Sequence, residues 1–184
     1  MRTRNAILLL FWTGTAMLSA ACTRASSPAG GDNAKTPAAE VHGNLAHVMR
    51  GILFPNANVI FAAQDEKAIN VKPAEDPSLS TNPLTGAYGG WEAVQNSALA
   101  LAESANLLTI AGRRCANGRP VPIDNPDWPK FVQGLRDAGM AAAKAAESKS
   151  QDSMVMAADT MTTACSNCHD KYRDKPGGDA DRCM

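Results

Sequence analysis

The sequence predicts an all-α protein, an antiparallel bundle of four amphipathic helices, on three observations. Four stretches carry apolar residues at intervals of three and four, which places them on one face of a helix. No stretch alternates apolar and polar residues in the manner of a strand. Of the 184 residues, 45% are hydrophobic but only 5% aromatic, which suits a helical core of Ala, Leu, Val and Met. Antiparallel packing would bury the four apolar faces against one another.

The N-terminal residues have the composition of an export signal followed by a tether. Residues 1–21 join Arg2 and Arg4 to an apolar run that ends in small residues, the pattern of a cleaved signal peptide. Residues 22–39 are rich in Ser, Ala, Gly and Pro, which predicts a flexible tether. Without residues 1–21 the chain keeps 16 of its 18 basic residues against 18 acidic ones, a net charge of −2. Nothing in this balance indicates a nucleic-acid partner.

Two interpretations of Cys22 stay open. It follows small residues directly, and this position resembles that of the lipidated cysteine of a bacterial lipobox, which predicts a membrane-anchored lipoprotein. The alternative is ordinary cleavage without lipid. The expected location is the periplasm in both cases. Cys115 and Cys183 either form a disulfide in that oxidising compartment, which would leave Cys22 for lipid, or stay as two unpaired thiols.

The first helix is expected from Glu40, with the apolar stripe Val41, Leu45, Val48, Met49 and Ile52. Pro55 is expected to break or kink it, because proline lacks a backbone donor, and residues 57–63 continue the helical pattern. Proline and glycine are frequent in residues 69–90 and again in 113–126, which predicts two long irregular connections.

Three further helices are expected, one between these connections and two after them. The second runs from about Trp91 to Ala111, and its apolar face includes Val94, Ala98 and Leu101. The third begins near Asp127 or Pro129, and Trp128 and Phe131 are expected on its buried side. The second half of the third helix consists almost entirely of small residues. Either Ala is there because it favours the helix, or the small side chains let a neighbouring backbone or a flat macrocycle approach closely. The fourth helix, capped by Ser150 or Asp152, runs to a cysteine motif. Four methionines are expected to fill the core: Met140, Met154, Met156 and Met161.

The motif is Cys165-Ser166-Asn167-Cys168-His169, and C-x-x-C-H is the attachment signature of a covalent haem. Two thiols three residues apart share a helix face, so each can add across a different vinyl group of one porphyrin. His169 then presents its imidazole to the iron as the proximal ligand. The sequence therefore predicts one haem c, with its iron, bound by Cys165, Cys168 and His169.

Two other uses of these cysteines fit less well. A structural zinc site needs four ligands, usually as two spaced pairs, and neither Cys115 nor Cys183 has a Cys or His partner two to four residues away. A thioredoxin-like dithiol belongs at the N-terminus of a helix that follows a strand, where the helix dipole lowers the thiol pKa. The pair in this chain follows a long helical pattern instead.

The longer stretch 165–173, C-x-x-C-H-x-x-Y-R, resembles the terminal signature of class II cytochromes c, the cytochrome c′ group. The resemblance covers about residues 40–174 and leaves 175–184 as a tail. It implies a four-helix bundle with one covalently bound haem, a periplasmic location and, often, a homodimer. The long connections depart from the compact pattern of the group, so the oligomeric state stays open.

Members of this group differ in the sixth ligand of the iron. By resemblance Met49 falls where some members place an axial methionine, and it shares the inward stripe with Leu45 and Ile52. Plain core filling is the alternative for a methionine on such a stripe. His47 is expected on nearly the opposite face, in solvent. His42 is a weaker candidate for the iron, and a surface residue near the start of the helix is the preferred interpretation.

The sequence thus predicts an exported electron carrier with His169 and Met49 as axial ligands, which exchanges electrons with redox partners of the periplasm or membrane. The alternative is a five-coordinate haem protein that binds a small gas, nitric oxide or carbon monoxide. Neither interpretation makes the protein an enzyme. Peroxide reduction would need a polar distal group able to move protons, and only His42 is a candidate for that group.

Overall fold

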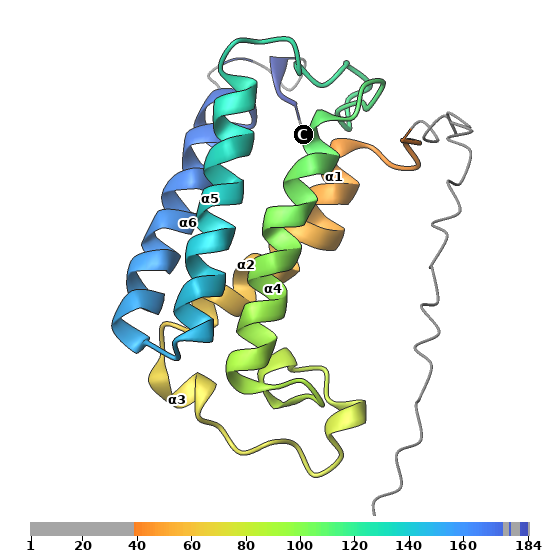
Figure 1. Ribbon diagram of the computed structural model, residues 1–184. Coiled ribbons are helices and arrows are strands. Elements are labelled where there is room, and N and C mark those ends of the chain that lie inside the picture. The colour runs from red at the N-terminus through yellow and green to blue at the C-terminus, as the bar shows by residue number, and fades with distance from the viewer. Residues whose placement is uncertain (1–38, 175–176, 178–180, 184) are drawn as a thin grey trace, which may run out of the picture. The chain divides into compact units, whose positions relative to one another are not determined.

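Helices make up the long regular elements of the chain (Figure 1). The computed structural model describes residues 39–174, 177 and 181–183. In chain order the helices are α1 (Leu45–Val48), a π-helical turn (Met49–Leu53), α2 (Phe54–Ala62), α3 (Glu66–Ile69), two 3₁₀ turns (Pro77–Leu79 and Pro83–Thr85), α4 (Gly90–Ser104), a 3₁₀ extension (Ala105–Thr109), α5 (Trp128–Glu147) and α6 (Gln151–Tyr172). Among the described residues, extended pairing is confined to an isolated bridge between Arg114 and Pro120. The all-α prediction is confirmed.

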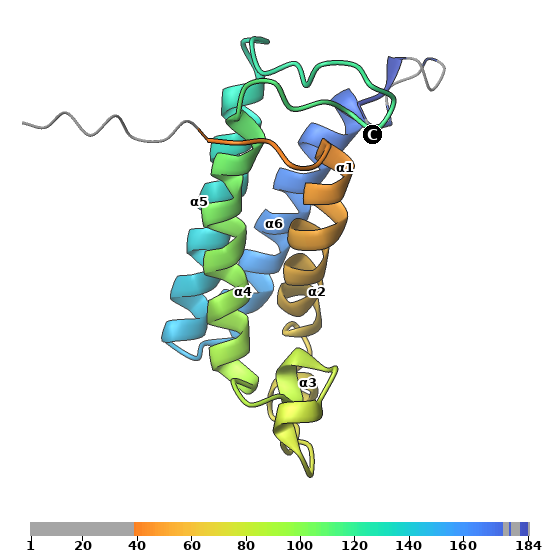
Figure 2. The same ribbon diagram turned by 90° about the vertical axis from the view of Figure 1, so that its right-hand side faces the viewer.

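The long helices pack side by side within the unit that runs from Ala38 to Met184. Helix α5 lies between α4 and α6, and α2 contacts both α4 and α6. Consecutive long helices run in opposite directions, as the colour gradient along them shows (Figure 2). Four apolar faces therefore meet along a common interior, with the cysteine motif near the C-terminal end of α6.

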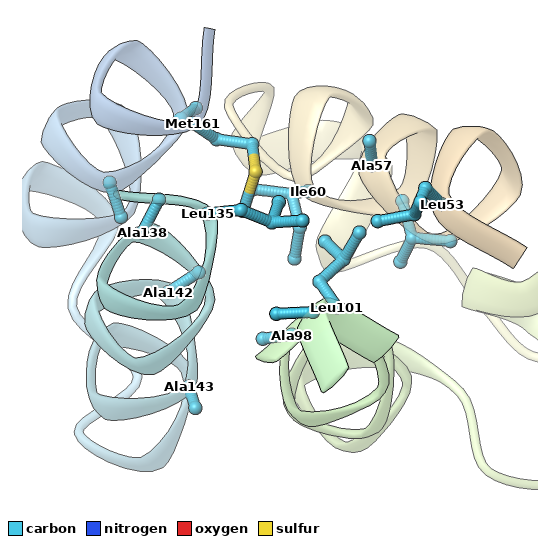
Figure 3. Packing of buried hydrophobic residues seen from close by; sticks show 14 of the residues in the cluster. Leu53, Ala57, Ile60, Ala98, Leu101, Leu135, Ala138, Ala142, Ala143 and Met161 are labelled. Carbon is cyan, nitrogen blue, oxygen red and sulfur yellow. The ribbon is translucent and has the colours of Figure 1, made fainter. Parts of the chain in front are cut away.

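The four long helices α2, α4, α5 and α6 each contribute side chains to this interior. Figure 3 shows Met161 of α6, Leu135 of α5, Leu101 of α4 and Ile60 of α2 directed toward one another. Ile60 and Met161 are fully buried, and Leu101 is 1% exposed. Two of the four methionines expected in the core are instead on the surface, since Met140 is 51% and Met156 70% exposed.

Small residues let α5 approach the backbone of α4 closely. A Cβ atom added at Gly139 would lie 2.9 Å from both the carbonyl oxygen of Ala98 and the amide nitrogen of Ala102. Ala138 and Ala142 on the same helix are fully buried. The small residues of α5 thus serve close contact between two helices, which is one of the two explanations that the sequence left open.

The first helix differs from its expected stripe in two respects. It begins at Leu45, because Asn44 caps it and forms a reciprocal capping box with His47, so Val41 lies before the helix. Farther along, Leu53 is buried at 6% exposure whereas Ile52 is only half-buried. The π-helical turn causes this second difference, since it holds one residue more than an α-helical turn and rotates the helix beyond it.

The two long connections are irregular, as expected, but both are tied to the helices. Leu84 of the first connection is buried at 6% exposure. In the second, Arg113 donates to the carbonyl of Gly43 at 2.7 Å, and the carbonyl of Arg114 accepts from the amide of Leu45 at 2.8 Å. The second connection therefore holds the start of the first helix in place.

None of the helices in the described part of the chain is both long and apolar enough to span a membrane. The predicted signal peptide at 1–21, nearly all of the tether at 22–39 with Cys22, and most of the tail at 175–184 lie outside the described residues.

Candidate functional site

A cavity of about 720 Å³ opens between the first helix and α6. This volume falls within the range of roughly 300 to 1,000 Å³ that is usual for small-molecule and cofactor sites. Its walls are largely apolar. The first helix, which comprises α1, the π-helical turn and α2, contributes Leu45, Met49, Leu53, Phe54, Ala57 and Phe61. Leu101 comes from α4 and Leu108 from its 3₁₀ extension, and α5 contributes Trp128, Phe131, Val132 and Leu135. Helix α6 adds both cysteines of the motif and the histidine beside them.

The cysteines of the motif are half-buried thiols at the cavity wall, in the C-terminal half of α6. Burial raises the pKa of Cys165, and it raises the pKa of Cys168 to about 11 with help from the neighbouring Cys165 and Asp127. Both thiols are protonated at neutral pH as a result. A redox dithiol needs the opposite, a thiol pKa lowered at a helix N-terminus. The position of the two cysteines, far from the N-terminus of α6, agrees with the expectation that they are not a thioredoxin-like dithiol.

His169 lines the same cavity and is half-buried. Burial, and then the charge of Arg173, lower its pKa, so the imidazole is neutral at pH 7 and suited to bind a metal. The Nδ1 atom lies 2.8 Å from Nη1 of Arg173. Because arginine only donates, Nδ1 accepts here, and the proton of the neutral ring is on Nε2.

Met49 reaches the cavity from the opposite wall, as the first residue of the π-helical turn. Its side chain is half-buried and packs against the core. The structure thus brings Met49, Cys165, Cys168 and His169 to one cavity, although 116 residues separate Met49 from Cys165 in the sequence. The four residues that the sequence singled out share one site.

The other two histidines lie outside this site. His47 is exposed and accepts a hydrogen bond from the amide of Asn44 through its Nδ1 atom, which confirms the expectation of a solvated side chain. His42 precedes the capped start of the helix, and its side chain is 85% exposed beside Glu40. Neither residue lines the cavity, so His42 agrees with the preferred expectation of a surface residue near the start of the helix and not with that of an iron ligand.

An aromatic cluster at the cavity wall was not anticipated as part of the site. The ring of Tyr172 meets Trp128 edge-on at 5.0 Å between centroids and Phe131 at 6.0 Å. The Tyr172 hydroxyl donates to Asp127 at 2.5 Å, and Lys171 pairs with the same carboxylate. The helical stripe of α5 predicted burial of Trp128 and Phe131, but helix periodicity alone does not tell which partner covers them.

A disulfide near the C-terminus borders the cavity. Cys115 and Cys183 are bonded, so the pairing that the sequence left open is formed. Cys183 lines the cavity, and its amide donates to the carbonyl of Tyr172 at 2.8 Å. Because these two sulfurs bind each other, neither is free to bind a metal ion with Cys165 and Cys168.

Comparison with protein-family models, with curated proteins and with solved structures gives no match for this chain.

Proposed function

We propose that the protein is an exported class II cytochrome c, a cytochrome c′-like antiparallel four-helix bundle that carries single electrons on one covalently bound haem. The observation that supports this most strongly is the composition of the cavity. Both thiols of a C-x-x-C-H motif, the adjacent imidazole and a thioether from another helix line one apolar space of cofactor size. The residues that are present therefore fit the group that the motif implies.

Each residue has a separate task in this proposal. Cys165 and Cys168 would hold the porphyrin covalently through thioether bonds, and His169 and Met49 would bind its iron. The haem supplies an iron that alternates between the ferric and ferrous states. A thioether ligand and apolar walls favour the ferrous state, so the reduction potential should be high for a haem protein.

Binding at the iron requires His169 to change its hydrogen bond. Coordination through Nε2 needs that nitrogen without its proton, and the neutral ring then carries its proton on Nδ1. Arg173 cannot donate to a protonated Nδ1, so the contact between Arg173 and His169 would open. Asp174 remains as a partner for the guanidinium, at 2.6 Å.

The proposed location is the periplasm, where redox partners of the periplasm or the membrane would exchange electrons with the protein. The disulfide between Cys115 and Cys183 supports an oxidising compartment. A lipid on Cys22 is the proposed anchor, and mass spectrometry of the mature N-terminus from a bacterial host tests it. A mature chain that starts at Cys22 and carries diacylglycerol supports the anchor, and an unmodified N-terminus contradicts it.

The decisive experiment is expression in a host that attaches haem c, followed by intact-mass spectrometry and absorbance of the reduced protein with and without carbon monoxide. We expect the mass of one haem to be retained under denaturing conditions, and a reduced spectrum that carbon monoxide changes slowly or not at all. Rapid uptake of carbon monoxide would instead favour the five-coordinate gas-binding protein. Bare polypeptide from a competent host would contradict both.

Matched variants assign the ligands. Met49→Leu should open the sixth position and admit carbon monoxide, whereas Met156→Leu, at a 70% exposed methionine of α6, should leave the spectrum unchanged. His169→Ala should abolish the proximal ligation, and His42→Ala at an exposed side chain is its control. Equal spectra for the Met49 variant and the unaltered protein would remove Met49 from the ligand set.

A further inference from the structure

The π-helical turn that begins at Met49 stands directly before a proline. The amide of Phe54 donates to the carbonyl of Met49, five residues back, where an α-helix would use the carbonyl of Arg50. Pro55 has no amide hydrogen to donate to Gly51, and in a regular helix its ring would clash with that carbonyl. The local sequence therefore gives a physical reason for a wide turn at this point.

This turn keeps one row of side chains on the cavity. The row has a spacing of four: Leu45, Met49, Leu53, Ala57 and Phe61 all line it. Arg50 also lines the cavity, but its side chain is exposed whereas that of Met49 is half-buried. In an uninterrupted α-helix, residues four apart drift by about 40° per step, so this row would wrap by about 160° from its first member to its last. One extra residue in the turn takes back about 100° of that drift. The row therefore stays on one side of the helix.

The register on either side of the turn depends on the extra residue. Helix α2 is held by Ile60, which is fully buried, and α1 is held by Leu45, Ala46 and Val48, which are 4%, 8% and 6% exposed. If the turn became α-helical, α1 and α2 would have to rotate relative to each other by about 100°, against these contacts. Relative to α2, the position that Met49 now occupies would pass to Arg50, the next residue in the chain.

We propose that Pro55 is a positioning residue for the sixth ligand: the turn that it imposes presents the thioether of Met49, and not the side chain of residue 50, to the iron. This inference rests on the proposed function, because it concerns the same haem site. Pro55 itself is exposed and does not line the cavity, so its effect acts through the helix.

The test is a register exchange in the haem-loaded protein, with four forms: the unaltered chain, Pro55→Ala, Met49→Leu with Arg50→Met, and those two substitutions together with Pro55→Ala. We expect a thioether-ligated spectrum, closed to carbon monoxide, in the first and the fourth. The second and third should lose the thioether-to-iron absorption band and take up carbon monoxide at least tenfold faster. Rescue by a methionine one residue later separates a change of register from general destabilisation.

Three results would overturn the inference while leaving the proposed function intact. One is a Pro55→Ala protein with the spectrum and carbon monoxide rate of the unaltered chain. Another is thioether ligation in the form that carries Met49→Leu and Arg50→Met but keeps Pro55. The third is a Pro55→Ala protein in which solution NMR still shows the hydrogen bond from Phe54 to Met49. If instead Met49→Leu alone leaves the unaltered spectrum, methionine ligation fails, and with it both this inference and that part of the proposed function.

Discussion

Removal of the disulfide between Cys115 and Cys183 should weaken the fold by an amount that the loop length predicts. The two cysteines are 68 residues apart in the sequence. In the chain-entropy model, opening a closed loop of this length gives the unfolded chain about 15 cal/mol/K of entropy, or about 4 kcal/mol at 25 °C. The variant Cys115→Ala/Cys183→Ala should therefore lose roughly 3 to 4 kcal/mol of its free energy of unfolding.

Urea unfolding of the haem-loaded protein, followed by far-ultraviolet circular dichroism, measures this loss. The iron is kept ferrous by ascorbate in every sample, so that dithiothreitol acts only on the disulfide. The thioether bonds of a haem c are not cleaved by dithiothreitol, so that reagent should lower the stability of the unaltered protein to the level of the variant. The variant itself should not respond. A loss below about 1 kcal/mol, or a variant that dithiothreitol still destabilises, would show that this bond does not restrain the chain as calculated.

Two further predictions concern helix contacts and acid. Gly139→Ala should lower the free energy of unfolding by about 1 to 2 kcal/mol, because its Cβ would meet the α4 backbone. Gly134→Ala on the same helix, where a Cβ meets nothing within 4 Å, should instead raise it by up to about 1 kcal/mol; equal thermal-unfolding shifts would refute the close-contact argument. A hydrogen bond from Lys171 lowers the pKa of Asp127. This carboxylate therefore stabilises the fold fully at pH values above the ordinary pKa of an aspartate. The stabilisation disappears as the pH falls through the lowered pKa. Asp127→Asn should flatten the acid limb of the stability profile, and an unchanged limb would contradict that assignment.

Helix existence, and the starts of α4, α5 and α6, followed from local sequence in this chain, whereas the first helix begins at Leu45 and not at the expected Glu40. The start of α5 at Trp128 and the capping of α6 by Ser150 agree with the expected positions to within a residue or two. The apolar stripe of α4 is also correct, because Val94, Ala98 and Leu101 are all buried. Spacing and capping are properties of consecutive residues, and such properties can be read without knowledge of the fold.

The candidate site was predicted in part. Cys165, Cys168 and His169 form a contiguous motif, and motif spacing alone brought them together. Met49 required a resemblance to a family, because an apolar stripe does not distinguish a ligand from core filling. The aromatic wall that includes Tyr172 was missed altogether, since its contacts join α5 to α6 across more than 40 residues.

The errors have two physical origins. Met156 was expected in the core but is exposed, because the stripe of α6 is narrower than its count of apolar residues suggests. Ile52 was expected on the inward face, yet Leu53 holds that place after the π-helical turn. A change of helical register displaces every later residue, and a uniform period cannot anticipate it.

By itself the sequence determined that the chain is helical and where α4, α5 and α6 start, and it supplied the C-x-x-C-H motif on which the proposed haem site rests. Only the tertiary structure decided that Cys115 pairs with Cys183, that a wide turn precedes Pro55, and that Met49 shares a cavity with His169. The first group depends on neighbours a few residues apart along one helix. The second depends on which helix faces touch, and that is decided when distant segments bury their apolar surfaces together.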